Sequence, residues 1–271
     1  MMRFFRTCWL LVLFCACQTD TPEPEAPFPF QLLRQDHTGL DFRNSPTLDE
    51  KFNVFNYMYF YNGGGLAAGD FDGDGLVDLY FTSNQDANRL YLNEGDFSFR
   101  DVTETAGVKG QAGWATGATV VDINNDGRLD IYVSQVGDYL HLKGHNQLYV
   151  NQGVTDGVPI FQEQAADYGL DLVGFGTQGA FFDYDGDGDL DLYQLNHSLH
   201  QNGTFGKREN KAGEVHPLAG DRLLRNDGAR FTDVTATAGI TSSVVGYGLG
   251  VVTGDLNADG WPDIYVGNDF H

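Results

Sequence analysis

Short runs of hydrophobic residues alternate with loops rich in Asp and Gly along most of the chain, and no stretch has the apolar spacing of a long amphipathic helix. One layout occurs four times: an apolar segment with small residues, an acidic loop, and a second apolar segment. The segments before the loops are 65–69, 117–121, 179–182 and 250–254, and those after them are 79–81, 131–133, 192–194 and 264–266. Each unit therefore predicts a strand, a loop and a second strand.

Two further elements follow these hairpins and complete the repeat. The first, whose alternating apolar positions predict a third strand, is found at 88–93, 146–151 and 221–226. The second is closely similar at 99–108 and 231–240, with a weaker copy at 161–170. Several short strands per repeat predict an all-β fold of β-propeller blades or a related β array, with about four blades present.

The acidic loops place oxygen-bearing side chains at positions 1, 3, 5 and 9, with a backbone carbonyl available at position 7. The four sets are Asp70, Asp72, Asp74, Leu76 and Asp78; Asp122, Asn124, Asp126, Arg128 and Asp130; Asp183, Asp185, Asp187, Asp189 and Asp191; and Asp255, Asn257, Asp259, Trp261 and Asp263. Ligands in this arrangement wrap a hard cation, and the Gly at position 6 permits the sharp turn. The loops therefore predict binding of up to four Ca²⁺ ions.

The residues in and around the loops argue against an EF-hand, a magnesium site and a zinc site. The pattern is the first half of an EF-hand loop, but strands flank it, and position 12, which should be a bidentate Glu, is Phe81, Val133, Gln194 or Val266. Many flexible carboxylates favour Ca²⁺ over Mg²⁺, and the lack of His or Cys at these positions disfavours zinc. The alternative, that the Asp-Gly stretches are simple turns, is disfavoured because four copies lie in phase with four strand pairs.

The four loops are expected to differ from one another. The second and fourth have Asn124 and Asn257 at position 3, so their charge is lower and weaker cation binding is expected. Asp189, at position 7 of the third loop, is expected to ligate through its backbone carbonyl while its side chain faces water.

Together with the Gly-rich residues 174–180, the loops resemble FG-GAP or VCBS repeats. The run 61–78, followed by 88–93 and 101–108, is similar to the cartilage acidic protein and ASPIC/UnbV group. The resemblance covers residues 36–271. It implies a Ca²⁺-stabilised propeller, seven-bladed as in integrin α-subunits, with the loops carried inside the blades.

The amino terminus has the features of an export signal. Residues 1–6 contain two Arg, and the apolar run 8–16 is too short to span a bilayer. The run resembles a bacterial lipoprotein signal in which the chain is cleaved before Cys17 and this Cys is lipidated, although Phe14 stands where Leu is usual. An ordinary secretory signal is the alternative.

The expected organisation is a signal peptide at 1–16, a lipidated Cys17 with a Pro-rich tether at 17–35, and the repeat propeller at 36–271. The protein is expected in the cell envelope, on the outer membrane or cell surface, with a lipid anchor as its sole membrane contact. No Cys follows Cys17, which excludes a disulfide framework and a Cys-based zinc site.

The charge balance narrows the class of partner. The chain has 16 Lys and Arg against 38 Asp and Glu, a formal net charge of −22. This balance argues against nucleic acid, because phosphate binding needs a basic surface. The 20 Phe and 13 Tyr exclude an acidic disordered chain and supply a core. Bound cations would offset the self-repulsion of a compact acidic domain.

Other residue clusters are interpreted as structural. His197 and His200 lie in the longest insertion, which is read as a solvated loop, with a protruding binding loop as the alternative. The residues Tyr57, Tyr59, Phe60 and Tyr61 are interpreted as core or inter-blade packing rather than as a platform for sugars. The run 246–250 imitates a nucleotide-binding fingerprint, but it precedes a strand and is rejected.

The favoured function is that of a binding, adhesion or scaffold module for a protein or glycan, because the loops at one end of a propeller suit recognition. No nucleophile and base stand out, so the protein is not expected to be an enzyme. The alternatives are a polysaccharide-active hydrolase or lyase built on the propeller, and a purely structural spacer.

Seven blades of about 60 residues each need on the order of 420 residues. The chain after residue 16 has 255 residues, enough for roughly four blades, and is interpreted as an amino-terminal fragment of a longer protein. Closure by oligomerisation and an open array are the alternatives.

Overall fold

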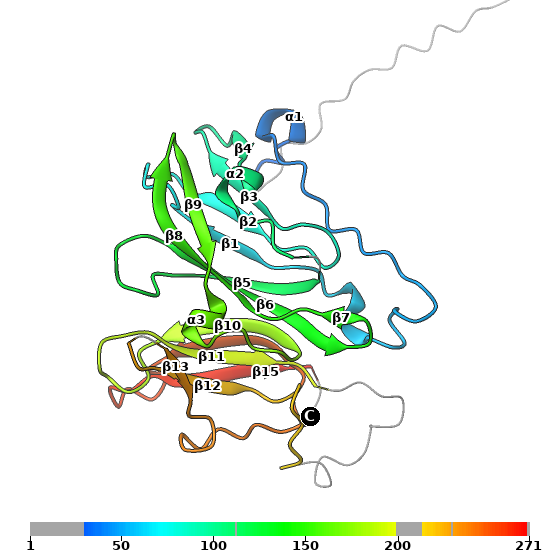
Figure 1. Ribbon diagram of the computed structural model, residues 1–271, viewed down its shortest axis with the longest axis vertical. Coiled ribbons are helices and arrows are strands. Elements are labelled where there is room, and N and C mark those ends of the chain that lie inside the picture. Colours follow the sequence, from blue (N-terminus) through cyan, green and yellow to red (C-terminus); the bar gives the residue numbers. More distant parts are fainter. Residues whose placement is uncertain (1–29, 112, 199–212, 229, 270–271) are drawn as a thin grey trace, which may run out of the picture. The chain divides into compact units, whose positions relative to one another are not determined.

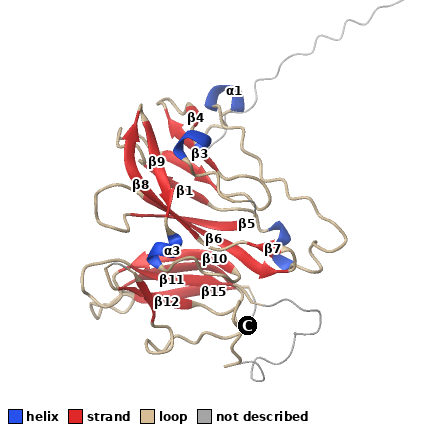
Figure 2. Cartoon of the chain, viewed as in Figure 1, coloured by secondary structure: helices blue, strands red, loops and turns tan. Residues whose placement is uncertain are grey.

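The computed structural model of the protein describes residues 30–111, 113–198, 213–228 and 230–269. The chain divides into Met1–Leu33 and a compact unit, Arg34–His271, which contains all the helices and strands named below. Antiparallel sheets dominate this unit (Figures 1 and 2). The short helical segments of the described chain are α1 (Gln35–Thr38), η1 (Met58–Tyr61), α2 (Thr103–Ala106) and α3 (Ala165–Tyr168). The all-β prediction is confirmed.

Four sheets follow one another along the chain and are called blades 1 to 4. Blade 1 is β1 (Leu66–Gly69), β2 (Asp78–Phe81), β3 (Arg89–Asn93) and β4 (Phe99–Asp101). Blade 2 is β5 (Trp114–Val121), β6 (Asp130–Tyr139), β8 (Gln147–Thr155) and β9 (Val158–Glu163), with β7 (Leu142–Lys143) paired to β6. Blade 3 is β10 (Gly176–Phe182), β11 (Asp191–Asn196), β12 (Arg222–Asn226) and β13 (Phe231–Asp233), and blade 4 is β14 (Gly248–Gly254) with β15 (Asp263–Asn268).

Each acidic loop joins the first two strands of its blade in the same register. In blade 1 Gly69 pairs with Asp78, so the residue before the loop faces its ninth residue. The equivalent pairs are Val121 with Asp130, Phe182 with Asp191, and Gly254 with Asp263. The predicted unit of strand, loop and strand is present four times, and the predicted third strands are β3, β8 and β12.

The hydrophobic core lies mainly between consecutive blades. One buried cluster joins Leu90 and Ala106 of the first repeat to Ile131 and Tyr149 of blade 2. A second cluster joins blades 2 and 3, and a third joins blades 3 and 4. A single blade has two hydrophobic faces and cannot bury both alone, so stacking of neighbouring blades supplies the core.

The first strands of successive blades lie side by side and are called the inner strands. The Thr119 hydroxyl of β5 donates to the carbonyl of Gly179 in β10 (2.9 Å), and the hydroxyl of Thr82, which follows β2, donates to the carbonyl of Thr116 in β5 (2.9 Å). Glycine permits this approach, because a Cβ at Gly117 would lie 2.4 Å from the carbonyl oxygen of Thr177. The arrangement of blades is therefore propeller-like, with about four blades, as the sequence predicts.

An aromatic segment, residues 52–60, precedes the first blade and contacts blades 2 and 3. The ring of Phe52 meets that of Trp114 edge-on, with centroids 4.8 Å apart, and Phe60 lies 5.1 Å from the same ring. Phe175, which immediately precedes β10 of blade 3, belongs to the same buried cluster. Tyr57, Tyr59 and Phe60 are buried as the sequence predicts, whereas the neighbouring Tyr61 is 63% exposed.

The helical turns α2 and α3 were not expected from the sequence. Each follows the fourth strand of its blade and ends at a glycine in the left-handed region, Gly107 (φ +78°) and Gly169 (φ +74°). Four residues are too few to show a helical period, so hydrophobic patterning cannot reveal such a turn.

The fourth loop contains a residue in an unfavourable backbone conformation. Positions 4 and 6 of every acidic loop have positive φ, and position 4 of this loop is Ala258, at φ +63°. We expect Ala258→Gly to raise the free energy of unfolding by about 0.5–1 kcal/mol, because glycine removes the strain of the left-handed region. Ala236→Gly, at an exposed turn position without positive φ, is the control and should show no gain in urea unfolding. Equal effects of the two variants would contradict the prediction.

Candidate metal centre

The first aspartate of each acidic loop draws the loop backbone around its own carboxylate. In the first loop Asp70 accepts hydrogen bonds from the backbone N–H groups of Gly73 (2.7 Å), Asp74 (3.1 Å) and Gly75 (2.9 Å). Asp183 accepts the same three in the third loop, while Asp122 and Asp255 each accept two. The loop is thereby closed into a ring of oxygen-bearing side chains before any cation is considered.

The ninth residue of the loop has a different environment from the others. Asp78 is fully buried, and its two carboxylate oxygens accept hydrogen bonds from the backbone N–H groups of Phe71 (2.9 Å) and Asn93 (2.8 Å). The same pair of bonds reaches Asp130 from Ile123 and Asn151, and Asp191 from Tyr184 and Asn226. Each of these aspartates therefore joins the start of the acidic loop to the third strand of its blade.

Burial changes the proton affinity of these carboxyls. Desolvation raises the pKa of Asp78 and of Asp130 to about 6, because an apolar environment disfavours the charged form; the two backbone N–H groups oppose this shift. The pKa of Asp191 is raised for the same reason. A cation held in the loop would favour the charged carboxylate and lower these values again.

Three asparagines that close the third strands support the loops and were missed by sequence reasoning. The Asn93 side chain donates to the carbonyl of Val77 (3.0 Å), the eighth residue of the loop, and accepts from the backbone N–H of Gly95 (3.0 Å). Asn151 and Asn226 make the equivalent contacts in blades 2 and 3. Their recurrence at the end of the third predicted strand was the available signal.

Two of the four loops bring three carboxylates together. Within the described residues, the groups with ligand atoms all within 4.8 Å of one another are Asp70, Asp72 and Asp78 in the first loop, and Asp183, Asp185 and Asp187 in the third. These are predicted ligands, and each set draws on positions 1 and 3 of its loop. Converging carboxylates repel one another unless a cation or protons lie among them.

The third loop also turns two carboxylate oxygens away from solvent. Oδ1 of Asp185 and Oδ1 of Asp189 are buried and accept no hydrogen bond from the described residues. Asp189 as a whole is only partly buried, so the expectation that its side chain faces water stays a prediction. Burial together with the charge of Asp187 raises the pKa of its carboxyl to about 6. Buried oxygens without donors fit a bound cation, so the donor set suits a metal ion.

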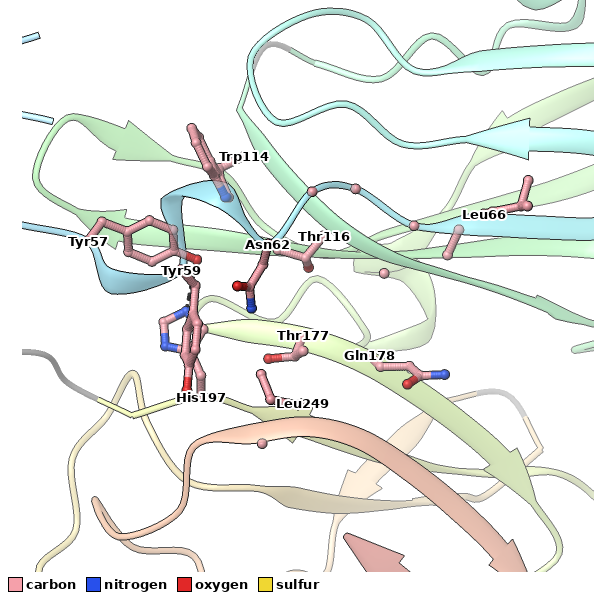
Figure 3. A pocket seen from close by; sticks show the side chains of 16 residues that line it. Tyr57, Tyr59, Asn62, Leu66, Trp114, Thr116, Thr177, Gln178, His197 and Leu249 are labelled. Atoms are coloured by element: carbon pink, nitrogen blue, oxygen red, sulfur yellow. Dashed lines mark hydrogen bonds between the residues drawn. The ribbon is translucent and has the colours of Figure 1, made fainter. Parts of the chain in front are cut away.

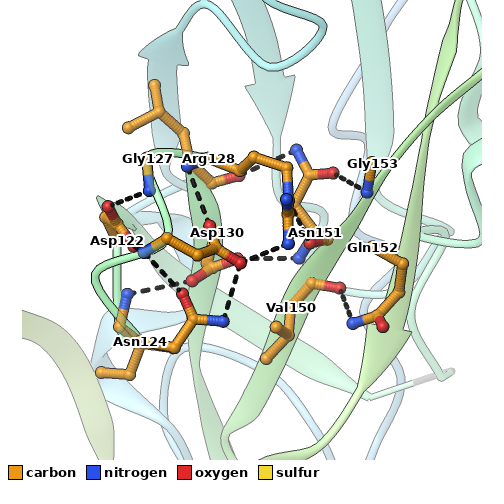
Figure 4. A network of polar contacts seen from close by, with 12 residues as sticks. Asp122, Asn124, Gly127, Arg128, Asp130, Val150, Asn151, Gln152 and Gly153 are labelled. Carbon is orange, nitrogen blue, oxygen red and sulfur yellow. Dashed lines mark hydrogen bonds and ion pairs between the residues drawn. The ribbon is translucent and has the colours of Figure 1, made fainter.

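In the second loop, neighbouring side chains of the loop itself contact the carboxylate at position 5 (Figure 4). The Asn124 side chain donates to Asp126 Oδ2 (3.0 Å), and the guanidinium of Arg128 forms an ion pair with the same carboxylate. Arg128 also donates to the carbonyl of Asn151 (3.0 Å). In the fourth loop Asn257 likewise donates to Asp259 (3.0 Å). Both loops hold their predicted ligands in place but with fewer free carboxylate oxygens.

The residues at position 7 are held by position 5 in every loop. The backbone N–H groups of Leu76 and Arg128 donate to Oδ1 of Asp74 (2.8 Å) and Asp126 (2.9 Å). The equivalent donors in the third and fourth loops are Asp189 and Trp261, to Asp187 (3.1 Å) and Asp259 (2.9 Å). Position 9 of the fourth loop, Asp263, accepts from the N–H of Leu256 (2.8 Å) as its equivalents do.

His197 is placed differently from the sequence expectation. It is not part of a solvated insertion: its exposed fraction is 2%, and its ring lies against those of Tyr59 and Phe175. Its Nε2 is 3.0 Å from the Tyr57 hydroxyl, and its Nδ1 is 3.0 Å from the carbonyl of Ser198. The companion His200 lies outside the described residues, as do the predicted signal peptide and Cys17.

No helix in the described part of the chain is both long and apolar enough to cross a bilayer. The predicted lipid anchor lies in the segment 1–29, for which no structure is described.

Comparison with known proteins identifies the repeat. Residues 70–133, which contain the first two loops, match the FG-GAP-like repeat family. Human (Homo sapiens) cartilage acidic protein 1 is 30% identical over 162 residues, covering 59% of this chain and 23% of the relative. The mouse (Mus musculus) protein of that name is 30% identical over 139 residues, covering 48% and 20%. The Xenopus tropicalis protein is 27% identical over 161 residues, covering 58% and 23%.

The chain thus spans less than a quarter of the length of these relatives, and it contains an FG-GAP-like repeat. The similarity to the cartilage acidic protein group, expected from the sequence, is confirmed.

The two kinds of loop carboxylate can be separated by substitution. We expect Asp191→Asn to lower the free energy of unfolding of the metal-free protein by about 2 kcal/mol, because an amide group would face a buried backbone N–H. Asp189→Asn should leave that stability unchanged or raise it, since it removes one of several crowded like charges. Urea unfolding in excess chelator measures both. Equal stability of the Asp191→Asn variant and the parent would contradict the assignment.

Proposed function

We propose that this chain is a calcium-stabilised propeller module that is exported, anchored at a cell surface, and used for binding or adhesion. The observation that carries the calcium assignment is the pair of buried, donor-free carboxylate oxygens on Asp185 and Asp189. Hydrogen-bond donors do not reach these atoms from the described residues, whereas a hard cation with six to eight oxygen ligands would use them. The first and third loops are the proposed higher-affinity sites.

The composition of the loops sets the expected affinity. They lack the bidentate Glu of an EF-hand, and two of them have an Asn at position 3. Loops of this kind belong with extracellular calcium modules, whose dissociation constants are about 10⁻⁴ to 10⁻³ M. Such sites would fill outside the cell and stay empty in the cytosol. The proposed calcium binding and the proposed export therefore support each other.

Recognition is proposed because the fold presents loops from successive blades at one end, and because the matched repeat is an FG-GAP-like repeat. A hydrolase or lyase would need an acid and a base in a cleft. The cleft formed by the described inner strands is lined by His197 but by no Asp or Glu, so its geometry does not favour that alternative.

Calcium should stabilise the folded protein. Binding to the folded state alone, at about 5 mM Ca²⁺ and a dissociation constant of about 10⁻⁴ M, adds about 2 kcal/mol per occupied site. We therefore expect the melting temperature to rise by at least about 5 °C relative to protein in excess chelator. The same concentration of Mg²⁺ should give a smaller rise. A melting temperature that calcium leaves unchanged would refute the proposal.

The loops should contribute unequally to this rise. We expect Asp187→Ala to remove more of the calcium-dependent stabilisation than the matched substitution Asp126→Ala, because Arg128 already neutralises Asp126 in the second loop. Isothermal titration with calcium, together with melting in chelator for each variant, separates lost binding from lost folding. Equal losses in the two variants would contradict the ranking of the loops.

The proposed anchor has a direct test at the predicted lipidation site. Cys17→Ser should release the protein from the membrane fraction or leave it unprocessed, because no thiol remains to carry the lipid. Cys15→Ser, two residues away, is the matched control and should fractionate like the parent. Labelling with a radioactive fatty acid gives an independent readout, and the proposal is wrong if Cys17→Ser retains the label and its membrane location.

A further inference from the structure

A cavity of about 300 Å³ lies where the inner strands of the four blades meet (Figure 3). Its lining includes the residue six places before the first loop aspartate in every repeat: Gly64, Thr116, Thr177 and Leu249. These four occupy equivalent positions, so the cavity is a product of the repeat itself. The segment before blade 1 contributes further wall residues, among them Tyr59 and Asn62.

The pairing of three inner strands with their neighbours is interrupted beside the cavity. The pairing register shifts between Ala115 and Ala118 in β5, between Gly176 and Gln178 in β10, and between Gly248 and Gly250 in β14. The residues skipped by these shifts include Thr116, Thr177 and Leu249. A bulge of this kind redirects a side chain away from the regular pleat. Three blades thus use a bulge to aim one residue at the same space.

The two threonines at this level differ in how their hydroxyls are used. The hydroxyl of Thr116 lies 2.9 Å from the carbonyl oxygen of Ser134 and 2.7 Å from that of Gly176, so it holds blade 2 to blade 3. The hydroxyl of Thr177 is buried and has no hydrogen-bond partner among the described residues. A buried hydroxyl without a partner costs folding free energy, and such a cost is commonly retained for function.

Two amide side chains accompany this hydroxyl. Neither Asn62 nor Gln178 makes a side-chain hydrogen bond within the described chain, and both line the cavity. Figure 3 shows the Asn62 amide and the Thr177 hydroxyl directed toward the same space, whereas the Gln178 amide points away from both. The cavity therefore offers donors and acceptors that the protein does not itself satisfy.

The lining has no Asp, Glu, Lys or Arg, which restricts the chemistry of a ligand in a protein whose net charge is −22. Its histidine, His197, has Nε2 3.0 Å from the Tyr57 hydroxyl and Nδ1 3.0 Å from the carbonyl of Ser198, so both ring nitrogens already contact the protein. An anion would meet a repulsive field with no Lys or Arg beside it, and a cation would find no carboxylate. The faces of Trp114 and Tyr57 are buried, so they offer no open ring for a cation or for stacking.

We infer that this cavity binds one neutral sugar residue, held by hydrogen bonds to Thr177 and Asn62. Uncharged hydroxyls match uncharged amide and hydroxyl groups. A volume of about 300 Å³ is at the lower limit of ligand pockets, which suits a single terminal unit rather than a chain. The inference extends the proposed binding function by naming a ligand class and a site distinct from the acidic loops.

The test uses the full chain with Trp9→Phe and Trp261→Phe, which leaves Trp114, in the cavity wall, as the only tryptophan. Neutral hexoses, 6-deoxyhexoses and N-acetylhexosamines are titrated in the presence of calcium, with glucuronate and glucosamine as charged comparisons. We expect at least one neutral sugar to change the Trp114 fluorescence saturably, and the charged sugars to bind more weakly. A preference for either charged sugar, or no saturable binding by the folded protein, would overturn the inference.

Substitution at Thr177 separates binding from folding. Thr177→Val should weaken sugar binding about tenfold, because one hydrogen bond is lost, while the melting temperature stays equal or rises. The exposed Thr105→Val is the matched control and should change neither quantity. Asn62→Ala, at an exposed position that folding tolerates, should also weaken binding. Sugar affinity unchanged by both cavity variants would overturn the site.

Failure of this inference is distinguishable from failure of the calcium proposal. Sugar binding without any calcium effect on melting would uphold the cavity and refute the calcium sites. A calcium-dependent rise in melting temperature, with no sugar bound at saturating calcium, would do the reverse. Displacement of the bound sugar by a peptide that binds more tightly would assign the cavity to a protein ligand and overturn the inference.

Discussion

Each complete blade depends on one buried carboxylate that accepts two backbone hydrogen bonds. Asp78, Asp130 and Asp191 stand at the point where the second strand begins, and each joins the start of the acidic loop to the third strand. A carboxylate is suited to this role because both oxygens accept and neither donates. Its burial is unfavourable on its own, as the raised pKa of Asp78 shows. The fold therefore couples the geometry of the loop to the geometry of the sheet.

The other end of the blades is governed by glycine rather than by charge. A Cβ at Gly65 would lie 2.6 Å from the backbone nitrogen of Ala118 in blade 2, and one at Gly117 would lie 2.4 Å from the carbonyl oxygen of Thr177 in blade 3. At these points the inner strands can approach one another because a side chain is absent. The same repeat therefore produces both the acidic loops and the inner cavity. Its carboxylates lie in the loops that join the first two strands of each blade, and its small residues lie where the inner strands contact one another.

The regular features of the molecule could be predicted because they recur. Four copies of one pattern, in which apolar segments flank an acidic loop, located the hairpins. Apolar residues at every second position then identified the third segment of the repeat as a strand. The buried Oδ1 of Asp189, the burial of His197 and the free hydroxyl of Thr177 could not be predicted in this way. Each depends on contacts between segments far apart in the chain, which local pattern does not report. For the loop ligands, the sequence indicates which residues could coordinate a cation, and the structure adds which carboxylates converge.

The aromatic segment at 52–60 has a consequence for how the molecule unfolds. Blades that contact only their neighbours behave as a linear array, in which stability is a sum of nearest-neighbour terms and opening can begin locally. This segment lies outside every blade yet contacts Trp114 of blade 2 and Phe175 and Ala219 beside blade 3. It adds an interaction that spans more than one interface. The aromatic segment, which forms no strand, would then govern the cooperativity of unfolding across the blades. It would also govern how strongly each blade resists amide hydrogen exchange.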